Sequence, residues 1–263
     1  MVKEVAILLN GSIKNDSRVI KTIKTISEKH FVDLFYVNAG KGDNLIFGEN
    51  VKLIPCANKV SLKRKIIKHT CFYNEYLFFV DKVLEQKRNY DFVWSNDLPC
   101  LKPGVILKKK LDAKLVYDSH EIYNETLNQF FPQKSTGLKK VLFSFMIKNM
   151  RFWGKIAERK YVKKVDTFIT VGNELKKYFE KEYGLDNIKV IMNCPSLETK
   201  FTALNLKNKL GIKQTDKLFI YQGVLNAGRG LNLLIKSFSR VNEGIYLFIL
   251  GAGTLKKVLT ENA

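Results

Sequence analysis

The segment Lys114-Leu-Val-Tyr-Asp-Ser-His-Glu121 is a short apolar run that ends abruptly in four polar side chains. Its apolar part predicts a buried strand, and in an open α/β sheet ligands bind in the crevice beyond the carboxyl ends of the strands. The polar residues from Asp118 to Glu121 can donate or accept hydrogen bonds and carry charge at such a crevice. The segment therefore predicts an α/β sheet with a functional site at this strand end. The alternative is that His120 and Glu121 only cap the following helix.

Strand-like and helix-like segments alternate on both sides of this run. Alternation with short connections predicts a doubly wound, mostly parallel sheet, whose strands are continuous apolar runs because helices cover both faces. The predicted fold class is therefore α/β and Rossmann-like. Strands are expected over 5–9, 32–37, 51–54, 91–95, 114–117, 167–171 and 189–192, and helices over 15–29, 61–87, 99–110, 138–164 and 174–183.

A change of composition near residue 196 predicts a domain boundary. Ser196–Asn208 is polar and weakly periodic, as expected of a linker. The alternation then restarts, with strands expected over 218–221 and 246–250 and helices over 229–241 and from 255 onward. We expect an N-terminal Rossmann-like domain over 1–196, and over 197–263 the linker and the first part of a second such domain. Because a domain of this kind usually needs roughly 100 to 150 residues, the second one is expected to be truncated.

The composition is that of a globular protein that attracts anions. Of the 263 residues, 46% are hydrophobic and 12% aromatic, and the net charge is +20. Such a charge draws a protein toward nucleic acid, an anionic membrane surface or phosphorylated substrates. The sequence carries no clustered motif of an RNA- or DNA-binding module, so no nucleic-acid partner is expected.

The sequence predicts a cytoplasmic protein with reduced cysteines. Met1–Asn10 has too short an apolar run for a signal peptide and is expected to be the first strand. No apolar stretch approaches the roughly 20 residues of a membrane span. Four scattered cysteines, without a Cys-x-x-Cys pair or a nearby histidine, favour free thiols over disulfides or a zinc site. No metal site is expected.

A glycine-bearing loop with one arginine follows the first strand of the second part. In Tyr221–Leu231 this loop leads directly into a helix start, where free N–H groups and the helix dipole attract phosphate. Arg229 would bind a diphosphate there. The alternative is that the glycines only shape a turn and Arg229 is solvated. Gly251-Ala-Gly253 repeats the pattern of a strand, a glycine-bearing loop and a helix. A single Gly-x-Gly is weak support for phosphate binding.

The order of these motifs resembles the retaining glycosyltransferases of the GT-B fold, specifically glycosyltransferase family 4 (the group 1 type). The resemblance covers nearly the whole chain and rests on seven segments in the right order and spacing. They are Val5–Gly11, Asn15–Val19, Lys114–Glu121, Glu158 with Asp166–Gly172, Lys189–Asn193, Tyr221–Leu231 and Phe248–Gly253.

The resemblance implies transfer of a hexose from a nucleotide diphosphate sugar to a cell-envelope glycan or lipid-linked acceptor, with retained anomeric configuration. Such transfer serves polysaccharide or lipopolysaccharide biosynthesis, and it uses no cofactor and no essential metal. His120 matches the catalytic histidine that faces the transferred sugar, and Arg229 one of two residues that bind the diphosphate. Gly11 matches a loop that approaches the donor. The other residues expected to bind substrate are Asp118, Glu121, Gly230, Gly251 and Gly253.

The sequence departs from the family pattern at two places in its second part. The other basic residue of the family usually follows the strand's glycine, but here Val224 follows Gly223. The family's pair of glutamates eight positions apart belongs further downstream than Ala263. These departures leave a second interpretation open, in which a truncated, inactive remnant binds membrane or acceptor without transferring sugar.

Two basic amphipathic segments predict contact with an anionic membrane at the inner face of the plasma membrane. In 138–164 one stripe holds Lys148, Arg151, Lys155 and Arg159, and another is apolar. Residues 61–87 mix lysines with aromatics in the same way. Basic amphipathic helices with aromatics bind anionic membrane surfaces. The alternative is that both are ordinary core helices with solvated lysines.

Overall fold

The computed structural model describes residues 1–37, 47–56, 76–126, 137–195, 204–226 and 228–261. Two compact units divide the chain. Unit 1 contains the described residues up to Cys194, and unit 2 contains those from Pro195 onward. Unit 1 includes Lys114–Glu121, the segment in which the sequence predicts a functional site.

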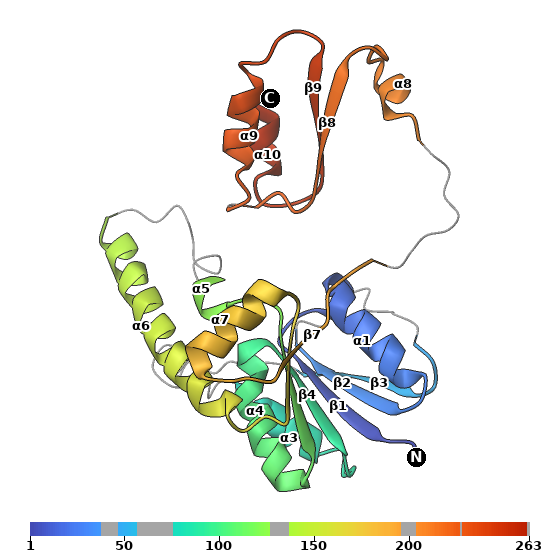
Figure 1. Ribbon diagram of the computed structural model, residues 1–263, viewed down its shortest axis with the longest axis vertical. Helices are drawn as coiled ribbons and strands as arrows, with labels where there is room; N and C mark the ends of the chain where they lie inside the picture. The colour runs from blue at the N-terminus through green and yellow to red at the C-terminus, as the bar shows by residue number, and fades with distance from the viewer. Residues whose placement is uncertain (38–46, 57–75, 127–136, 196–203, 227, 262–263) are drawn as a thin grey trace. The chain divides into compact units, whose positions relative to one another are not determined.

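Unit 1 is built on a parallel sheet of seven strands in the order β3-β2-β1-β4-β5-β6-β7 (Figure 1). The strand order reverses between the adjacent strands β1 and β4, and ligands bind at such a reversal in open α/β sheets. The predicted doubly wound α/β class is confirmed. The strands are β1 (Glu4–Leu9), β2 (Phe31–Tyr36), β3 (Val51–Pro55), β4 (Phe92–Asn96), β5 (Lys114–Ser119), β6 (Thr167–Thr170) and β7 (Ile188–Val190).

Helices cover both faces of this sheet because alternate strand residues point to opposite sides. Leu8 of β1 belongs to the same buried cluster as Phe79 of α3, whereas its neighbour Ile7 belongs to the cluster of Ile23 on α1. The two hydrophobic clusters hold the strand ends at fixed positions. The helices of unit 1 are α1 (Ser17–Ser27), α3 (Phe78–Leu84), α4 (Asp97–Leu111), α5 (Tyr123–Thr126), α6 (Gly137–Val162) and α7 (Asn173–Tyr183), with the 3-10 helix η1 (Ile13–Asn15).

Helix α4 lies directly against the sheet at Gly104. A β-carbon there would overlap Ser95 Oγ and lie 2.8 Å from Leu115 Cδ1. Gly104→Val therefore pushes α4 off β4 and β5, and we expect the free energy of unfolding to fall by about 3 kcal/mol. Urea unfolding followed by circular dichroism measures the loss. Gly48→Val, at an exposed glycine with no neighbour within 4 Å of an added β-carbon, is the control, and equal losses in both variants would contradict this packing.

Unit 2 holds two parallel strands, β8 (Lys217–Gln222) and β9 (Ile245–Leu250). Leu225, Leu231 and Leu259 form its buried cluster. Phe219 and Ile220 of β8 are more than half exposed, so this cluster covers only part of the strands. The helices are α8 (Leu206–Leu210), α9 (Leu231–Phe238) and α10 (Lys256–Glu261).

Most element boundaries lie within two residues of those expected from the sequence. Of the helix expected over 61–87, residues 61–75 lie outside the described residues, and α3 covers Phe78–Leu84. Helix α8 lies partly in the expected linker, and the short elements η1 and α5 were not expected. Among the described residues, none of the helices is long and apolar enough to cross a membrane.

Candidate functional site

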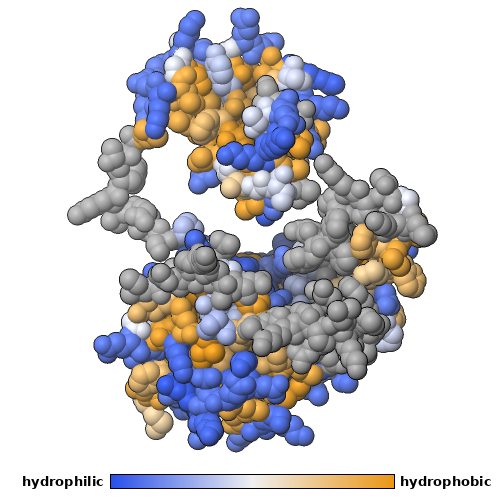
Figure 2. All heavy atoms as spheres, turned by 180° about the vertical axis from the view of Figure 1, so that it is seen from behind, coloured by the Kyte–Doolittle hydropathy of each residue, from blue (hydrophilic) through white to orange (hydrophobic). Residues whose placement is uncertain are grey.

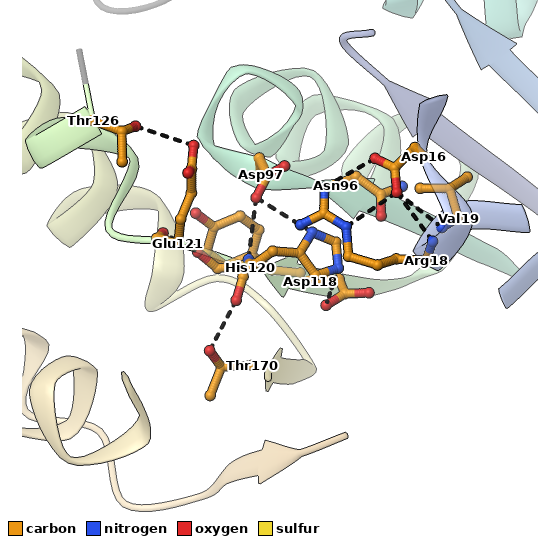
Figure 3. A network of polar contacts seen from close by, with 12 residues as sticks. Asp16, Arg18, Val19, Asn96, Asp97, Asp118, His120, Glu121, Thr126 and Thr170 are labelled. Atoms are coloured by element: carbon orange, nitrogen blue, oxygen red, sulfur yellow. Dashed lines mark hydrogen bonds and ion pairs between the residues drawn. The ribbon is translucent and has the colours of Figure 1, made fainter. Parts of the chain in front are cut away.

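His120 follows β5 directly, at the carboxyl edge of the sheet, and its side chain is only 4% exposed. Its Nε2 lies 3.2 Å from Asp118 Oδ1, and its Nδ1 lies 3.5 Å from Asp97 Oδ1. The backbone N–H of His120 donates to the same Asp97 oxygen at 3.1 Å. Figure 3 shows both carboxylates beside the imidazole. The adjacent strands β4 and β5 thus bring these three residues together.

The two carboxylates keep the imidazole charged. Burial disfavours the cation, but the interactions with Asp118 and Asp97 outweigh it and raise the pKa of His120 to about 9. The Nδ1 contact is long and poorly aligned for a hydrogen bond, so it acts chiefly through charge. Asp118 also accepts a hydrogen bond from Trp94 Nε1 at 3.2 Å, which fixes its orientation. A preorganised buried cation of this kind stabilises negative charge that develops beside it.

Asp97 has a strained backbone. It is the first residue of α4, and its φ of 56° lies in the left-handed region that residues other than glycine rarely adopt. Its neighbour Asn96 donates from Nδ2 to the carbonyl oxygen of Leu8 at 3.0 Å, which ties β4 to β1. Strain of this kind concentrates at functional sites. Asp97 therefore belongs to the candidate site, although it was not among the residues expected from the sequence.

A second fixed cation comes from the start of α1. Asp16 caps this helix by accepting hydrogen bonds from the backbone N–H groups of Arg18 and Val19. It also holds the Arg18 guanidinium at two points, each 3.0 Å long (Figure 3). Burial opposes both charges, yet the pairing lowers the pKa of Asp16 and raises the pKa of Arg18. The pair holds a rigid guanidinium near the carboxylates of the site.

A pocket of about 260 Å³ opens at this carboxyl edge of unit 1. Helix α1 contributes Arg18 and Lys21 to its lining, and the ends of β4 and β5 contribute Trp94, Asp118 and His120. The remaining wall is largely apolar and includes residues 191–193, which follow β7. In the described part of the chain, no group of three or more His, Cys, Asp or Glu side chains is placed to hold a metal ion.

The structure brings some of the expected residues of unit 1 into this pocket and not others. Asp118 and His120 line it, whereas Gly11 and Glu121 do not. The Glu121 carboxylate accepts a hydrogen bond from Thr126 Oγ1 at 3.0 Å, so it points toward α5 (Figure 3). A β-carbon at Gly11 would come no closer than 3.8 Å to Leu9, so packing does not demand a glycine there.

The expected residues of unit 2 lie at its loops and helix start. Arg229 is exposed and forms no ion pair with any other described residue. Gly230 is the N-cap of α9, with a φ of 70° that favours glycine. A β-carbon at Gly251 would overlap the carbonyl oxygen of Gly223, and one at Gly253 would overlap the backbone of Leu225. The glycines are therefore required by the local backbone, and the role of Arg229 in anion binding stays a prediction.

A buried carboxylate braces the chain behind the site. Glu158 of α6 is 1% exposed and accepts hydrogen bonds from Tyr117 Oη at 2.8 Å, Tyr183 Oη at 2.6 Å and Asn124 Nδ2 at 2.9 Å. Tyr117 lies on β5 and Asn124 on α5, on either side of His120. Burial raises the pKa of Glu158 to about 7, against the opposing effect of the tyrosine donors. Glu158 thus connects α6 and α7 to the segment that carries the histidine.

We expect Asp118→Asn to lower the pKa of His120 by about one unit or more, because the neutral amide no longer favours the cation. Titration of the imidazole by NMR measures this. Glu121→Gln is the matched control, since that carboxylate bonds Thr126 instead. Equal shifts in both variants would show that Asp118 does not hold the charge.

Comparison with known proteins gives one family and several structural relatives. The model of the family described as Glycosyltransferase Family 4 matches residues 25–198. Among curated proteins, a search finds no match. Sucrose-phosphate synthase from Thermosynechococcus elongatus has a similar structure, with a TM-score of 0.69 and 11% identity over 99% of this chain and 68% of that one.

Two further solved structures share the fold. HepE of Anabaena, in complex with UDP and glucose, has a TM-score of 0.64 and 16% identity over 99% of this chain. The lipopolysaccharide outer core galactosyltransferase WaaB has a TM-score of 0.59 and 14% identity over 98% of this chain. The chain spans 65% and 64% of the length of these two proteins. At such identities the likeness shows the fold, and it confirms the predicted GT-B type.

Proposed function

The chain belongs to glycosyltransferase family 4, and on this premise we propose that it transfers a hexose from a nucleotide diphosphate sugar to a cell-envelope glycan or lipid-linked acceptor, with retained configuration. The observation that carries the proposal is the buried, cationic His120 between two carboxylates in a pocket at the sheet edge. The complex of HepE with UDP-glucose and the galactosyltransferase name of WaaB support a nucleotide-sugar donor and an envelope acceptor.

In this reaction the bond between the donor's anomeric carbon and the diphosphate oxygen breaks. A bond forms from that carbon to an acceptor hydroxyl, whose proton leaves to the departing diphosphate. His120 orients the reacting groups and stabilises developing negative charge, and Asp118 and Asp97 hold the imidazole in place. Arg229 neutralises the diphosphate. No metal takes part in the proposed reaction.

A donor panel tests the proposal. The chain is incubated with UDP-, GDP- and ADP-hexoses and a lipid extract of bacterial envelopes as acceptor, with and without EDTA, and release of nucleoside diphosphate is followed. We expect acceptor-dependent release from at least one donor, unaffected by EDTA. Release that needs a divalent cation would contradict the metal-free reaction, and no release from any donor would favour the non-catalytic alternative.

We expect Arg229→Ala to raise the donor KM by about 10-fold or more, because a charge-assisted contact to the diphosphate is lost. Initial rates across donor concentrations measure the change. The control is Arg240→Ala, at another exposed arginine of unit 2. A KM that moves equally in both variants would remove Arg229 from the donor site.

We also propose that the protein is cytoplasmic and contacts an anionic membrane at the inner face of the plasma membrane, and the exposed face of α6 supports this contact. Figure 2 shows apolar side chains on the surface of this helix. Of the basic stripe, Arg151 and Lys155 pair with Glu125, so membrane contact would depend mainly on the apolar stripe. The large apolar side chains of α6 that are 39–69% exposed are Val141, Leu142, Phe145, Phe152, Trp153 and Ile156.

Vesicle sedimentation tests this membrane contact and the alternative function together. We expect binding to vesicles that contain phosphatidylglycerol and a loss of binding in Phe145→Ser. Equal sedimentation of both proteins would exclude α6 as the contact. Membrane binding without turnover of any donor would favour a chain that binds membrane or acceptor without sugar transfer.

A further inference from the structure

The pocket of unit 1 places large apolar side chains at its rim. Ile191 and Met192 line it and are 58% and 68% exposed. Ile169 and Val171 add to the apolar part of its lining. Exposed apolar side chains grouped around a concave site mark a surface that a ligand covers. The wall therefore favours a ligand with an apolar part.

Lys21 supplies the pocket with a charge that pairs with no carboxylate in the part of the chain that the structure describes. Its Nζ donates to Asn193 Oδ1 at 3.3 Å and to the carbonyl oxygen of Cys194. Both acceptors are neutral, and Lys21 forms no ion pair with a described carboxylate. An ammonium group has three donors, so one remains for a ligand. The other two cations of the lining are already paired, Arg18 with Asp16 and His120 with Asp118.

The pocket's size limits what can enter. At about 260 Å³ it lies just below the range of roughly 300 to 1,000 Å³ for pockets that hold a drug-sized ligand. It therefore holds one end group and not an oligosaccharide. A neutral sugar ring could bond the polar side chains of the lining, but it would leave the exposed Ile191 and Met192 uncovered and the Lys21 charge unpaired.

We propose that this pocket binds the phosphate-ester end of the acceptor, an apolar alcohol joined to phosphate. The hydrocarbon lies against Ile191 and Met192, and the phosphate binds the free donor of Lys21. This rests on the proposed function and deepens it, because it selects a lipid-linked phosphate over a neutral glycan as the acceptor. Lys21 becomes the residue that determines acceptor specificity.

Binding can be measured without any donor. The chain has two tryptophans, and Trp94 lines the pocket. In a Trp153→Phe background the fluorescence of Trp94 reports binding of geranyl phosphate, geraniol, inorganic phosphate or methyl glucoside. We expect geranyl phosphate to bind at least about 10-fold more tightly than each of the other three, since only it makes both contacts.

Matched variants separate the two contacts. Lys21→Gln is expected to weaken the binding of geranyl phosphate about 10-fold and to leave the binding of geraniol unchanged. Lys21→Arg is expected to restore much of the lost affinity. Lys24→Gln removes the same charge from an exposed position of α1 outside the pocket and is expected to change nothing. Met192→Ser is expected to weaken geranyl phosphate and geraniol alike.

Two outcomes overturn the proposal: equal losses in Lys21→Gln and Lys24→Gln, or methyl glucoside binding as tightly as geranyl phosphate. Because the binding measurement uses no donor, its result is independent of the transfer assay. Selective binding of geranyl phosphate without turnover of any donor supports the pocket assignment and contradicts the proposed function. Turnover of a donor by a chain that binds the test compounds without selectivity supports the proposed function and contradicts the pocket assignment.

Discussion

His120→Ala is expected to lower kcat/KM for sugar transfer by about 100- to 10,000-fold, the range for loss of a preorganised charged or proton-transferring group. The imidazole is buried, cationic and fixed by Asp118 and Asp97, and a methyl group at this position can supply neither its charge nor its contacts. The control is His30→Ala, which removes a histidine whose Nδ1 only accepts a hydrogen bond from the backbone N–H of Lys3 at 3.3 Å. Similar rates in the two variants would mean that His120 has no part in the reaction.

The charge of His120 also has a signature in the pH dependence of stability. The pKa of His120 is raised to about 9 in the folded protein, from an ordinary value of 6.5. A folded-state pKa above the unfolded one stabilises the protein fully below about pH 6.5, and the gain is lost as pH rises through about 9. Its size is about 3 kcal/mol. The free energies of unfolding of the wild type and His120→Gln are expected to differ most below about pH 6.5 and to converge at alkaline pH. A difference between the two free energies that stays constant with pH would contradict the raised pKa.

Glu158→Ala is expected to cost about 3 kcal/mol or more of the free energy of unfolding. The change leaves the buried donors of Tyr117, Tyr183 and Asn124 without their acceptor and opens a cavity behind β5. Urea unfolding measures it. Glu174→Ala, at a carboxylate whose side chain is 86% exposed, is the control and is expected to change stability far less. Equal effects would show that the buried network contributes nothing.

Glu158 also predicts a pH dependence of the opposite kind to that of a salt-bridged carboxylate. Its folded-state pKa is about 7, above the ordinary 4.5, so the folded chain binds more protons than the unfolded chain between these values. Stability therefore falls by about 3 kcal/mol as pH rises through this window. Glu158→Gln, which cannot titrate, is expected to flatten this part of the profile, and parallel profiles would contradict a raised pKa.

The inner strands of the large sheet could be predicted from the sequence because burial on both faces leaves a continuous apolar run. In β1 (Glu4–Leu9) five of the six residues are buried, so pattern alone identifies it. Helix α5 has four residues, too few for a helical period to show. The strand end at His120 was visible because polar residues follow the apolar run of β5 directly.

Asp97, one of the two carboxylate partners of His120, could not be predicted, because the order of strands in the sheet brings the two residues together. Asp97 lies 23 residues before His120, and Lys21 lies 172 residues before Asn193. Local pattern carries no information on such pairs. Polar residues at the end of β4, Asn96 and Asp97, were the available signal, and only the adjacency of β4 and β5 gives Asp97 its role. The direction of Glu121 toward Thr126 likewise depends on the position of α5.

The most direct test of the account is the anomeric configuration of the product formed from an α-linked nucleotide diphosphate hexose. The sugar is transferred to a hydroxyl of a lipid-phosphate-linked glycan acceptor by the wild-type chain, with His120→Ala in parallel, and the new linkage is assigned by the NMR coupling of its anomeric proton. A retaining transferase that depends on His120 gives an α-linked product from the wild type and almost none from the variant. A β-linked product, or the same yield from both proteins, would contradict it.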